Sequence, residues 1–161
     1  MSRMFVDTIV EKTSGAGVSI PGHLVQIAQY TDATNYTNST TSAAQATQTG
    51  TFTLKNSSNK VLVTINCITR AVRSSAAGVR IAIYRGAVSG GTKIRGGIEP
   101  QIYTTDAGTE QYAINTLQFL DTPNAASTTY SVGFWKHPSS GDVKVMGEFL
   151  NTNIILQEIA Q

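Results

Sequence analysis

Apolar side chains alternate with polar ones twice within residues 60–85, and this pattern constrains the fold more than any other feature of the sequence. Nearly every second residue of 60–70 and of 79–85 is apolar, which is the period of a β-strand whose two faces have different surroundings. Arg, Ser, Ala and Gly make up residues 73–78, a composition typical of a turn. The pattern predicts a long antiparallel hairpin, whose first strand spans about 30 Å at about 3.3 Å per residue.

The rest of the chain carries the same signals of extended structure. Only 14% of its residues are charged, against about 25% in average proteins. No segment has the 3.6-residue apolar period of a helix, and turn-forming residues separate the apolar segments. Further strands are predicted at residues 4–10, 18–20, 24–30, 49–54, 94–103, 112–120, 129–135, 142–146 and 153–159. Strands and turns at this spacing predict an all-β protein, an antiparallel jelly-roll sandwich.

Pro21 and Gly22 separate a short N-terminal segment from the main domain. A chain of 161 residues is long enough for one domain with a core but not for two. Residues 1–22 are therefore predicted to be a short β extension, and residues 23–161 the jelly-roll domain. Residues 31–48 are polar and are predicted to form a long surface loop, of the kind that often carries function.

The charge distribution and the single cysteine limit which partners and which compartment can be expected for the chain. Residues 33–98 contain no Asp or Glu, whereas seven acids follow them, so strands from the two halves are expected to neutralise each other. The alternative is a basic surface for an anionic partner. The net charge of +2 and the lack of exposed aromatics among the basic residues argue against nucleic acid. No disulfide is possible with one cysteine, and neither a secretory signal nor a membrane-spanning segment is expected.

No arrangement of side chains predicts catalysis or a metal site. His23 and His137 are far apart, and neither belongs to a metal-binding spacing. Cys67 shares a strand face with apolar residues, so a buried thiol is expected rather than a nucleophile. Trp135 is expected in the core or at its rim, or else stacked on a sugar. Three acids lack a nearby aromatic platform for glycan hydrolysis: Glu99, Asp106 and Glu110. We predict no enzyme activity, no cofactor and no metal.

Several segments resemble the strands of C1q/TNF-like jelly-roll domains. They are GTFTL from Gly50, residues 60–70, and VRIAIYR from Val79, and the later NTLQF, YSVGF and IILQEI are similar to the closing strands of that family. The opening FVDTIVEKTSGAGVSIPGH, from Phe5, resembles N-terminal segments of tail-fibre-like and other virion proteins of tailed bacteriophages. The chain lacks the long repetitive shaft of a fibre and the acid-rich calcium sites of some C1q-like domains.

The resemblance implies a homotrimer that is made in the host cytoplasm and located in the virion. The last strand has apolar residues on both sides, and in a monomer one side would face water. It is therefore predicted to form the trimer interface, through Ile154, Ile155, Leu156 and Ile159. The N-terminal segment is predicted to attach to other virion proteins through Phe5, Val6, Ile9, Val18 and Ile20.

Three functions are compatible with these features. The leading one is a structural virion protein of a tailed bacteriophage, a small trimeric tail fibre or receptor-binding tip. The alternatives are a trimeric capsid decoration or head-fibre protein and a cellular C1q-like binding module. In the leading function, loops contact a host surface glycan or protein through Tyr36, Asn38, Arg73 and His137.

Overall fold

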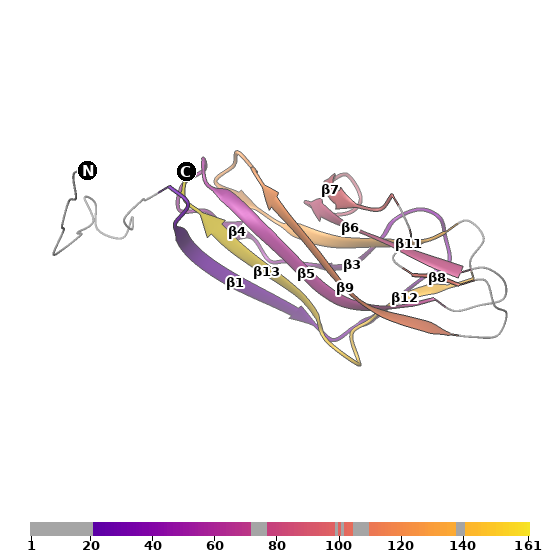
Figure 1. The fold of residues 1–161 in the computed structure, drawn as a ribbon. Coiled ribbons are helices and arrows are strands. Elements are labelled where there is room, and N and C mark those ends of the chain that lie inside the picture. The colour runs from indigo at the N-terminus through magenta and orange to yellow at the C-terminus, as the bar shows by residue number, and fades with distance from the viewer. Residues whose placement is uncertain (1–20, 72–76, 99, 101, 105–109, 138–140) are drawn as a thin grey trace, which may run out of the picture.

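The computed structural model describes residues 21–71, 77–98, 100, 102–104, 110–137 and 141–161, and every regular element in these ranges is a β-strand (Figure 1). The strands are β1 (Leu24–Asp32), β2 (Asn35–Asn38), β3 (Ala44–Gln48), β4 (Phe52–Thr53), β5 (Lys60–Ala71), β6 (Ala77–Arg85), β7 (Thr92–Gly96), β8 (Ile102–Thr104), β9 (Gln111–Asp121), β10 (Ser127–Thr128), β11 (Tyr130–Lys136), β12 (Val143–Met146) and β13 (Thr152–Ile159). The predicted all-β class is confirmed.

Two antiparallel sheets form a sandwich. In the six-stranded sheet, β5 has β9 on one edge and both β13 and β12 on the other, and β1 and β2 lie outside β13 and β12. In the five-stranded sheet, the order is β3, β11 and β6, and both β7 and β8 pair with the outer edge of β6. The chain crosses repeatedly from one sheet to the other, so that the first strand β1 pairs with the last strand β13. This is the strand order of a jelly roll, as predicted.

The two alternating segments of residues 60–85 form strands, but the predicted hairpin between them is wrong. β5 is hydrogen-bonded to strands of the six-stranded sheet and β6 to strands of the five-stranded sheet. The two strands therefore lie in opposite sheets. Alternation has the same period in a hairpin and in a crossing between sheets, so the sequence pattern does not distinguish them.

The core lies between the sheets and is formed by one side of each central strand. The odd-numbered residues of β5 are buried and its even-numbered residues are half-buried. From the opposite sheet, β6 and β11 contribute Ile81, Ile83 and Phe134, all fully buried. Burial of a side chain of this size stabilises the fold by about 1.5–3 kcal/mol. Cys67 belongs to this core, which confirms the predicted buried thiol.

The predicted loop at residues 31–48 is instead two strands and a short turn. β2 pairs with β12 and β3 pairs with β11, so this segment passes from one sheet to the other. Asn38 fixes the turn between them, because its Nδ2 donates to Ser42 O and to Phe134 O, both at 2.9 Å. The polar composition of the segment hid these edge strands, whose hydrogen bonds come from the backbone rather than from apolar alternation.

Glu158 organises the end of the sandwich where the chain terminates. Its side chain is fully buried on β13, and its carboxyl oxygens accept hydrogen bonds from Gln26 Nε2 at 2.5 Å, Asn59 Nδ2 at 2.7 Å and Lys55 N at 2.9 Å. Asn59 Oδ1 in turn accepts a bond from Gln161 N. A buried polar group is stable only when it is hydrogen-bonded, so these donors tie the segment before β5 to β1 and β13.

Among the described residues, two ion pairs join the basic and the acidic halves of the sequence, as expected for neutralising strands. Arg85 on β6 lies 3.3 Å from the buried Asp121 on β9, which also accepts a hydrogen bond of 2.9 Å from the hydroxyl of Tyr130. Arg70 on β5 pairs with Glu110. The Arg85 pair bridges the two sheets of the sandwich.

The described part of the chain begins at Pro21, and the residues that follow it are bonded to the last strand. Gly22 N donates to Ala160 O at 2.9 Å, and Ala160 N donates to His23 O at the same distance. The predicted strands at residues 4–10 and 18–20, and the attachment residues within them, lie outside the described residues. No helix in the described ranges is long and apolar enough to span a membrane.

Candidate subunit interface

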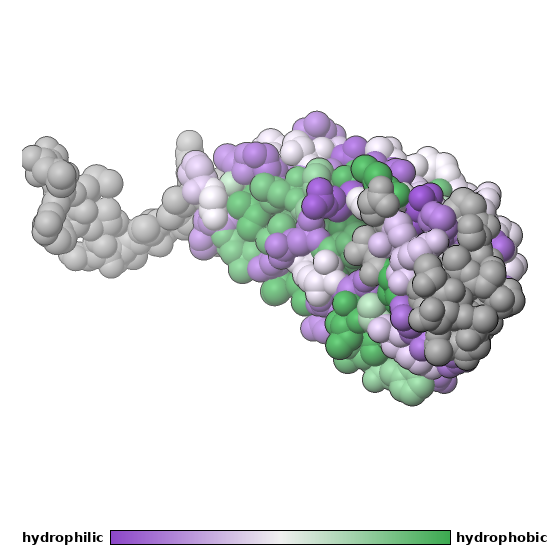
Figure 2. Space-filling model, turned by 45° about the vertical axis from the view of Figure 1, so that its right-hand side comes forward, coloured by the Kyte–Doolittle hydropathy of each residue, from purple (hydrophilic) through white to green (hydrophobic). Residues whose placement is uncertain are grey.

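The outer face of the six-stranded sheet carries apolar side chains that the protein's own core does not cover. On β9 the even-numbered residues point outward, and Ile114 is 73% exposed. On β1, at the opposite edge, Ile27 is 60% exposed. Most of the large exposed hydrophobic side chains in the described ranges lie on this face: Leu24, Ile27, Tyr112, Ile114, Leu120 and Phe149. Figure 2 shows hydrophobic surface gathered in patches with hydrophilic residues between them.

The middle of this face is polar but uncharged. Pairs of side chains bond across neighbouring strands, with Gln118 Nε2 donating to Thr64 Oγ1 at 2.9 Å and Thr116 Oγ1 donating to Asn66 Oδ1 at 2.7 Å. Gln29 Nε2 on β1 donates to an Asn side chain on β13 at 3.1 Å. Amide and hydroxyl groups both donate and accept, so a surface of this kind can pair with a second copy of itself without opposing like charges.

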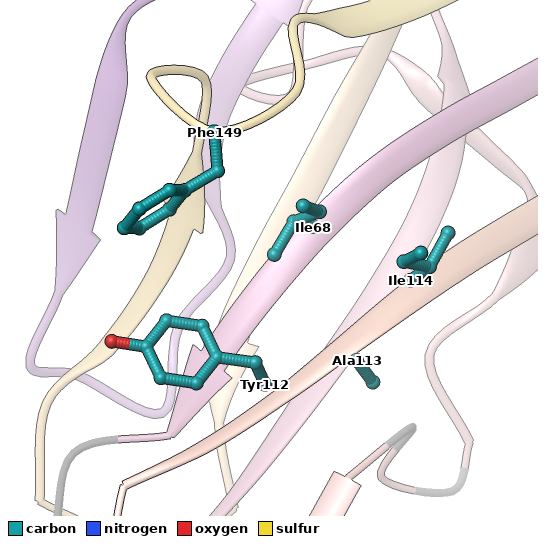
Figure 3. A pocket seen from close by; sticks show the side chains of 5 residues that line it. All are labelled: Ile68, Tyr112, Ala113, Ile114 and Phe149. Atoms are coloured by element: carbon teal, nitrogen blue, oxygen red, sulfur yellow. The ribbon is translucent and has the colours of Figure 1, made fainter.

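An open apolar hollow of about 380 Å³ lies on this face where the end of β5 meets the beginning of β9 (Figure 3). Ile68 from β5 and Ile114 from β9 flank it, and the rings of Tyr112 and Phe149 approach each other edge to face with centroids 6.0 Å apart. Phe149 comes from the segment between β12 and β13 and is 63% exposed. Aromatic side chains this exposed are enriched at contacts between proteins.

Charges stand only at the rim of this hollow. The guanidinium of Arg70 lies 5.7 Å from the centre of the Tyr112 ring and pairs with Glu110. The hydroxyl of Tyr112 donates to Glu110 Oε2 at 3.0 Å. Arg70 and Glu110 neutralise each other. Lys60 and Lys144 add positive charge toward the ends of the face, whereas its middle presents neutral polar groups to a partner.

The structure divides the four residues predicted for the trimer interface. Ile154 and Leu156 are 1% and 0% exposed and belong to the chain's own core, so these two residues are corrected from interface to core. Ile155 and Ile159 point to the outer face and are half-buried. Strand alternation requires this division, because neighbouring residues point to opposite sides.

Of the predicted receptor contacts that the structure describes, Asn38 and Tyr36 are bonded within the chain. Asn38 is buried and both polar atoms of its side chain are bonded within the chain, which contradicts its predicted role as a donor to a sugar. Tyr36 packs against the core and its hydroxyl donates to Asp32 Oδ2 at 2.7 Å. Burial raises the pKa of Asp32, but the bonds from Tyr36 and Thr34 outweigh it, and the pKa lies below its ordinary value. His137 is half-buried, edge to face with Tyr103 at 5.4 Å, and Arg73 lies outside the described residues.

The other side chains that the sequence analysis considered for chemistry, Cys67 and Trp135, are buried or covered by neighbours. Burial raises the pKa of the Cys67 thiol to about 12, so the thiolate is not populated near neutral pH. In the part of the chain that the structure describes, no three His, Cys, Asp or Glu side chains group as metal ligands. Trp135 is only 8% exposed and has Lys93 Nζ over its ring at 5.8 Å, so it offers no open face for stacking on a sugar.

The interface predicted from the sequence lay on the last strand alone and missed the contribution of β9 to this face. The apolar pattern of β9 could have indicated it. Residues 112–120 have apolar side chains at both even and odd positions, as in Tyr112, Ile114, Leu117 and Leu120. A strand with one polar face needs apolar residues at only every second position, so apolar residues on both sides indicate contacts on both sides.

Comparisons with known proteins give only distant likeness. No family model matches the sequence, and no curated protein matches it. A chain of the T13 particle of infectious bursal disease virus is similar at 10% identity and a TM-score of 0.44, over 84% of this chain and 35% of the viral one. A chain of T=1 particles derived from that virus is similar at 10% identity and a TM-score of 0.46, over 96% and 41%.

The chain thus spans about two fifths of the length of these viral chains. TM-scores below 0.5 do not establish a shared fold. The assignment of this protein therefore depends on its own geometry.

Proposed function

We propose that this protein is a structural virion protein of a tailed bacteriophage that assembles as a homotrimer, as a small tail fibre or receptor-binding tip without enzymatic activity. The observation that carries the proposal is the outer face of the six-stranded sheet. It combines exposed Ile27, Ile114 and Phe149 with a neutral row of amides and hydroxyls. Exposed apolar side chains that gather on one face with polar residues around them mark a contact with another protein.

The dimensions of the face suit contact between copies. Four strands about 4.8 Å apart and about ten residues long measure roughly 20 Å by 30 Å. This area is of the same order as the ~800 Å² that each partner buries in a stable interface. A closed ring of three copies covers the face in each of them, and the half-buried Ile155 and Ile159 become buried in the ring.

Two sequence resemblances support the location in a virion. The strand segments are similar to those of C1q/TNF-like jelly rolls, and residues 5–23 are similar to the N-terminal segments of tailed-phage virion proteins. In this proposal residues 1–22 attach the trimer to other virion proteins. The attachment segment leads into the domain beside its C-terminal strand, where Gly22 pairs with Ala160.

Replacement of Ile114 by Asp tests the assembly. Full burial of an isoleucine side chain is worth about 1.5–3 kcal/mol, so at 73% exposure its loss removes about 1–2 kcal/mol per copy and about 3–7 kcal/mol per trimer. Burying a carboxylate at the contact adds to this cost. We expect a trimer for the natural protein and a monomer for Ile114→Asp in sedimentation velocity at about 10 µM.

The matched control is Ile98→Asp, the same change at a residue that is 78% exposed and lies in the segment that follows β7 of the five-stranded sheet. Dissociation by both variants, or by neither, would contradict the proposed contact. Imaging of intact particles with labelled protein then distinguishes the locations. Label on the tail supports a fibre or tip, and label on the head identifies the decoration protein instead.

A further inference from the structure

A second concave surface lies at the open side of the sandwich, where β7 of one sheet faces β9 of the other. This surface, the edge cleft, has a volume of about 460 Å³ and is lined by residues 95–98 and 116–118. A smaller hollow of about 280 Å³ shares Arg95, Gly96 and Ile98 with it and adds Lys93. The volume of the edge cleft is within the range of about 300–1,000 Å³ that is typical of small-ligand sites.

The backbone of the edge cleft is held in place by glycines. Gly96 and Gly97 have φ of +86° and +80°, which favours glycine. A Cβ on Gly97 would stand 2.3 Å from the Trp135 ring, and one on Gly96 would stand 2.5 Å from Ile81 O. The wall of the cleft therefore packs directly on the five-stranded sheet and keeps its shape.

Two cations, Lys93 and Arg95, stand at this cleft, and no described carboxylate lines it. Lys93 and Arg95 are exposed, and neither forms an ion pair with another described residue. The Lys93 ammonium is held 5.8 Å from the centre of the Trp135 ring, which limits its freedom before a ligand arrives. No acid occurs among the residues that line either hollow. An anionic group is the ligand that these two side chains fit.

The opposite wall offers hydrogen-bond acceptors. Thr116 Oγ1 and Gln118 Nε2 already donate to Asn66 and Thr64, so the Thr116 oxygen and the Gln118 carbonyl oxygen remain to accept. Ile98, which is 78% exposed, adds an apolar surface between the cations and these acceptors. A ligand that fits all three has an anionic group, hydroxyl donors and a weakly polar C–H face, and an acidic sugar has this combination whereas a simple phosphate does not.

We infer that the edge cleft binds an acidic sugar of a host surface glycan, with Lys93 and Arg95 on its carboxylate or sulfate. The inference deepens the receptor-binding part of the proposed function and rests on it for the source of the glycan. Thr116 and Gln118 also belong to the outer face of the six-stranded sheet, so the inference requires that the trimer leaves the β9 edge of this face open.

The test is a titration of the full-length ¹⁵N-labelled chain, with amide shifts of residues 96–98 and 116–118 as the readout. The probes are trigalacturonate, sulfated maltotriose and neutral maltotriose. We expect saturable shifts with one or both acidic probes, and their comparison distinguishes a carboxylate from a sulfate. The neutral probe is expected to bind at least 10-fold more weakly.

Variants assign the binding to the two cations. Lys93→Gln with Arg95→Gln is expected to weaken the acidic sugar at least 10-fold. The matched control, Lys55→Gln with Lys60→Gln, removes the same charge beside Glu158 and Ile159 and is expected to change affinity less than 2-fold.

Three outcomes would overturn the inference: no shift with either acidic probe, equal binding of neutral and acidic sugars, or inorganic sulfate binding as tightly as the sugars. The sedimentation behaviour of the same sample keeps the two proposals apart. If neither the natural trimer nor the Ile114→Asp monomer binds the sugar, the edge cleft alone is rejected. A natural protein that is monomeric and binds the sugar rejects the assembly alone, and binding by the Ile114→Asp monomer but not by the trimer overturns the cleft as a receptor site.

Discussion

Replacement of Glu158 by Gln should destabilise the domain far more than its small chemical change suggests. The side chain is fully buried, and its two oxygens accept bonds from Gln26, Asn59 and the backbone at Lys55. An amide has only one acceptor oxygen, and its NH₂ group would face one or more of these donors. At least one buried donor then loses its partner.

The magnitude depends on which oxygen the NH₂ group replaces. Oε1 accepts from the backbone at Lys55 and Asn56 and from Asn59, whereas Oε2 accepts mainly from Gln26, which also bonds Thr53 O at 2.7 Å. The amide therefore costs least at Oε2, where one donor is left unsatisfied. Such a donor costs about 1–3 kcal/mol, a large part of the 5–15 kcal/mol that stabilises a typical domain.

Urea unfolding followed by the fluorescence of Trp135 measures this change. Glu148→Gln is the matched control, because Glu148 is exposed and its side chain should contribute less than about 0.5 kcal/mol. Equal midpoints for Glu158→Gln and Glu148→Gln would show that the buried network does not hold the end of the sandwich, and would refute this reasoning.

Two further predictions concern buried groups. Burial raises the pKa of Cys67 to about 12 and raises that of Tyr130 as well. Because the unfolded chain loses these protons first, the free energy of unfolding should be unaffected below about pH 9. It should then fall as pH rises toward 12, by up to about 1.4 kcal/mol per pH unit for Cys67. Cys67→Val should flatten the slope of a urea series across this range, and an unchanged slope would contradict the assignment to the thiol. Gly97→Ala should destabilise by about 1–3 kcal/mol more than Gly90→Ala in thermal unfolding. Both have positive φ, but only a Cβ at Gly97 meets the Trp135 ring. Equal losses of stability in Gly97→Ala and Gly90→Ala would show that the Trp135 ring moves aside at no cost and would contradict this prediction.

The strands of the core could be predicted from the sequence, and their partners could not. Alternation in residues 60–70 and 79–85 located β5 and β6, because one side of each strand is buried. Whether two such strands pair in one sheet or face each other from opposite sheets depends on hydrogen bonds to distant segments, which alternation does not encode. The polar edge strands β2 and β3 were not predicted for a related reason: they are defined by backbone hydrogen bonds to β12 and β11, not by apolar alternation.

The candidate interface could be predicted only in part. The two-sided apolar character of the last strand indicated a second contact, and Ile155 and Ile159 do face outward. Ile154 and Ile155 could not be assigned to the inner or the outer side before the register of β13 with β5 was known. The edge cleft could not be predicted from the sequence. Arg95 and Gln118 are far apart in the chain, and they lie close together only because β7 packs against β9.

Hydroxyl-radical footprinting of the native protein tests the central claim most directly, because two tyrosines provide an internal comparison. In a single chain Tyr112 on the outer face and Tyr103 on β8 are both 49% exposed. If the outer face of the six-stranded sheet is covered by other copies, Tyr112 should be oxidised several-fold more slowly than Tyr103 at about 50 µM. The Ile114→Asp variant should then restore its rate. Equal oxidation of the two tyrosines in the natural protein would show that the face is open to solvent, and would contradict the proposed assembly.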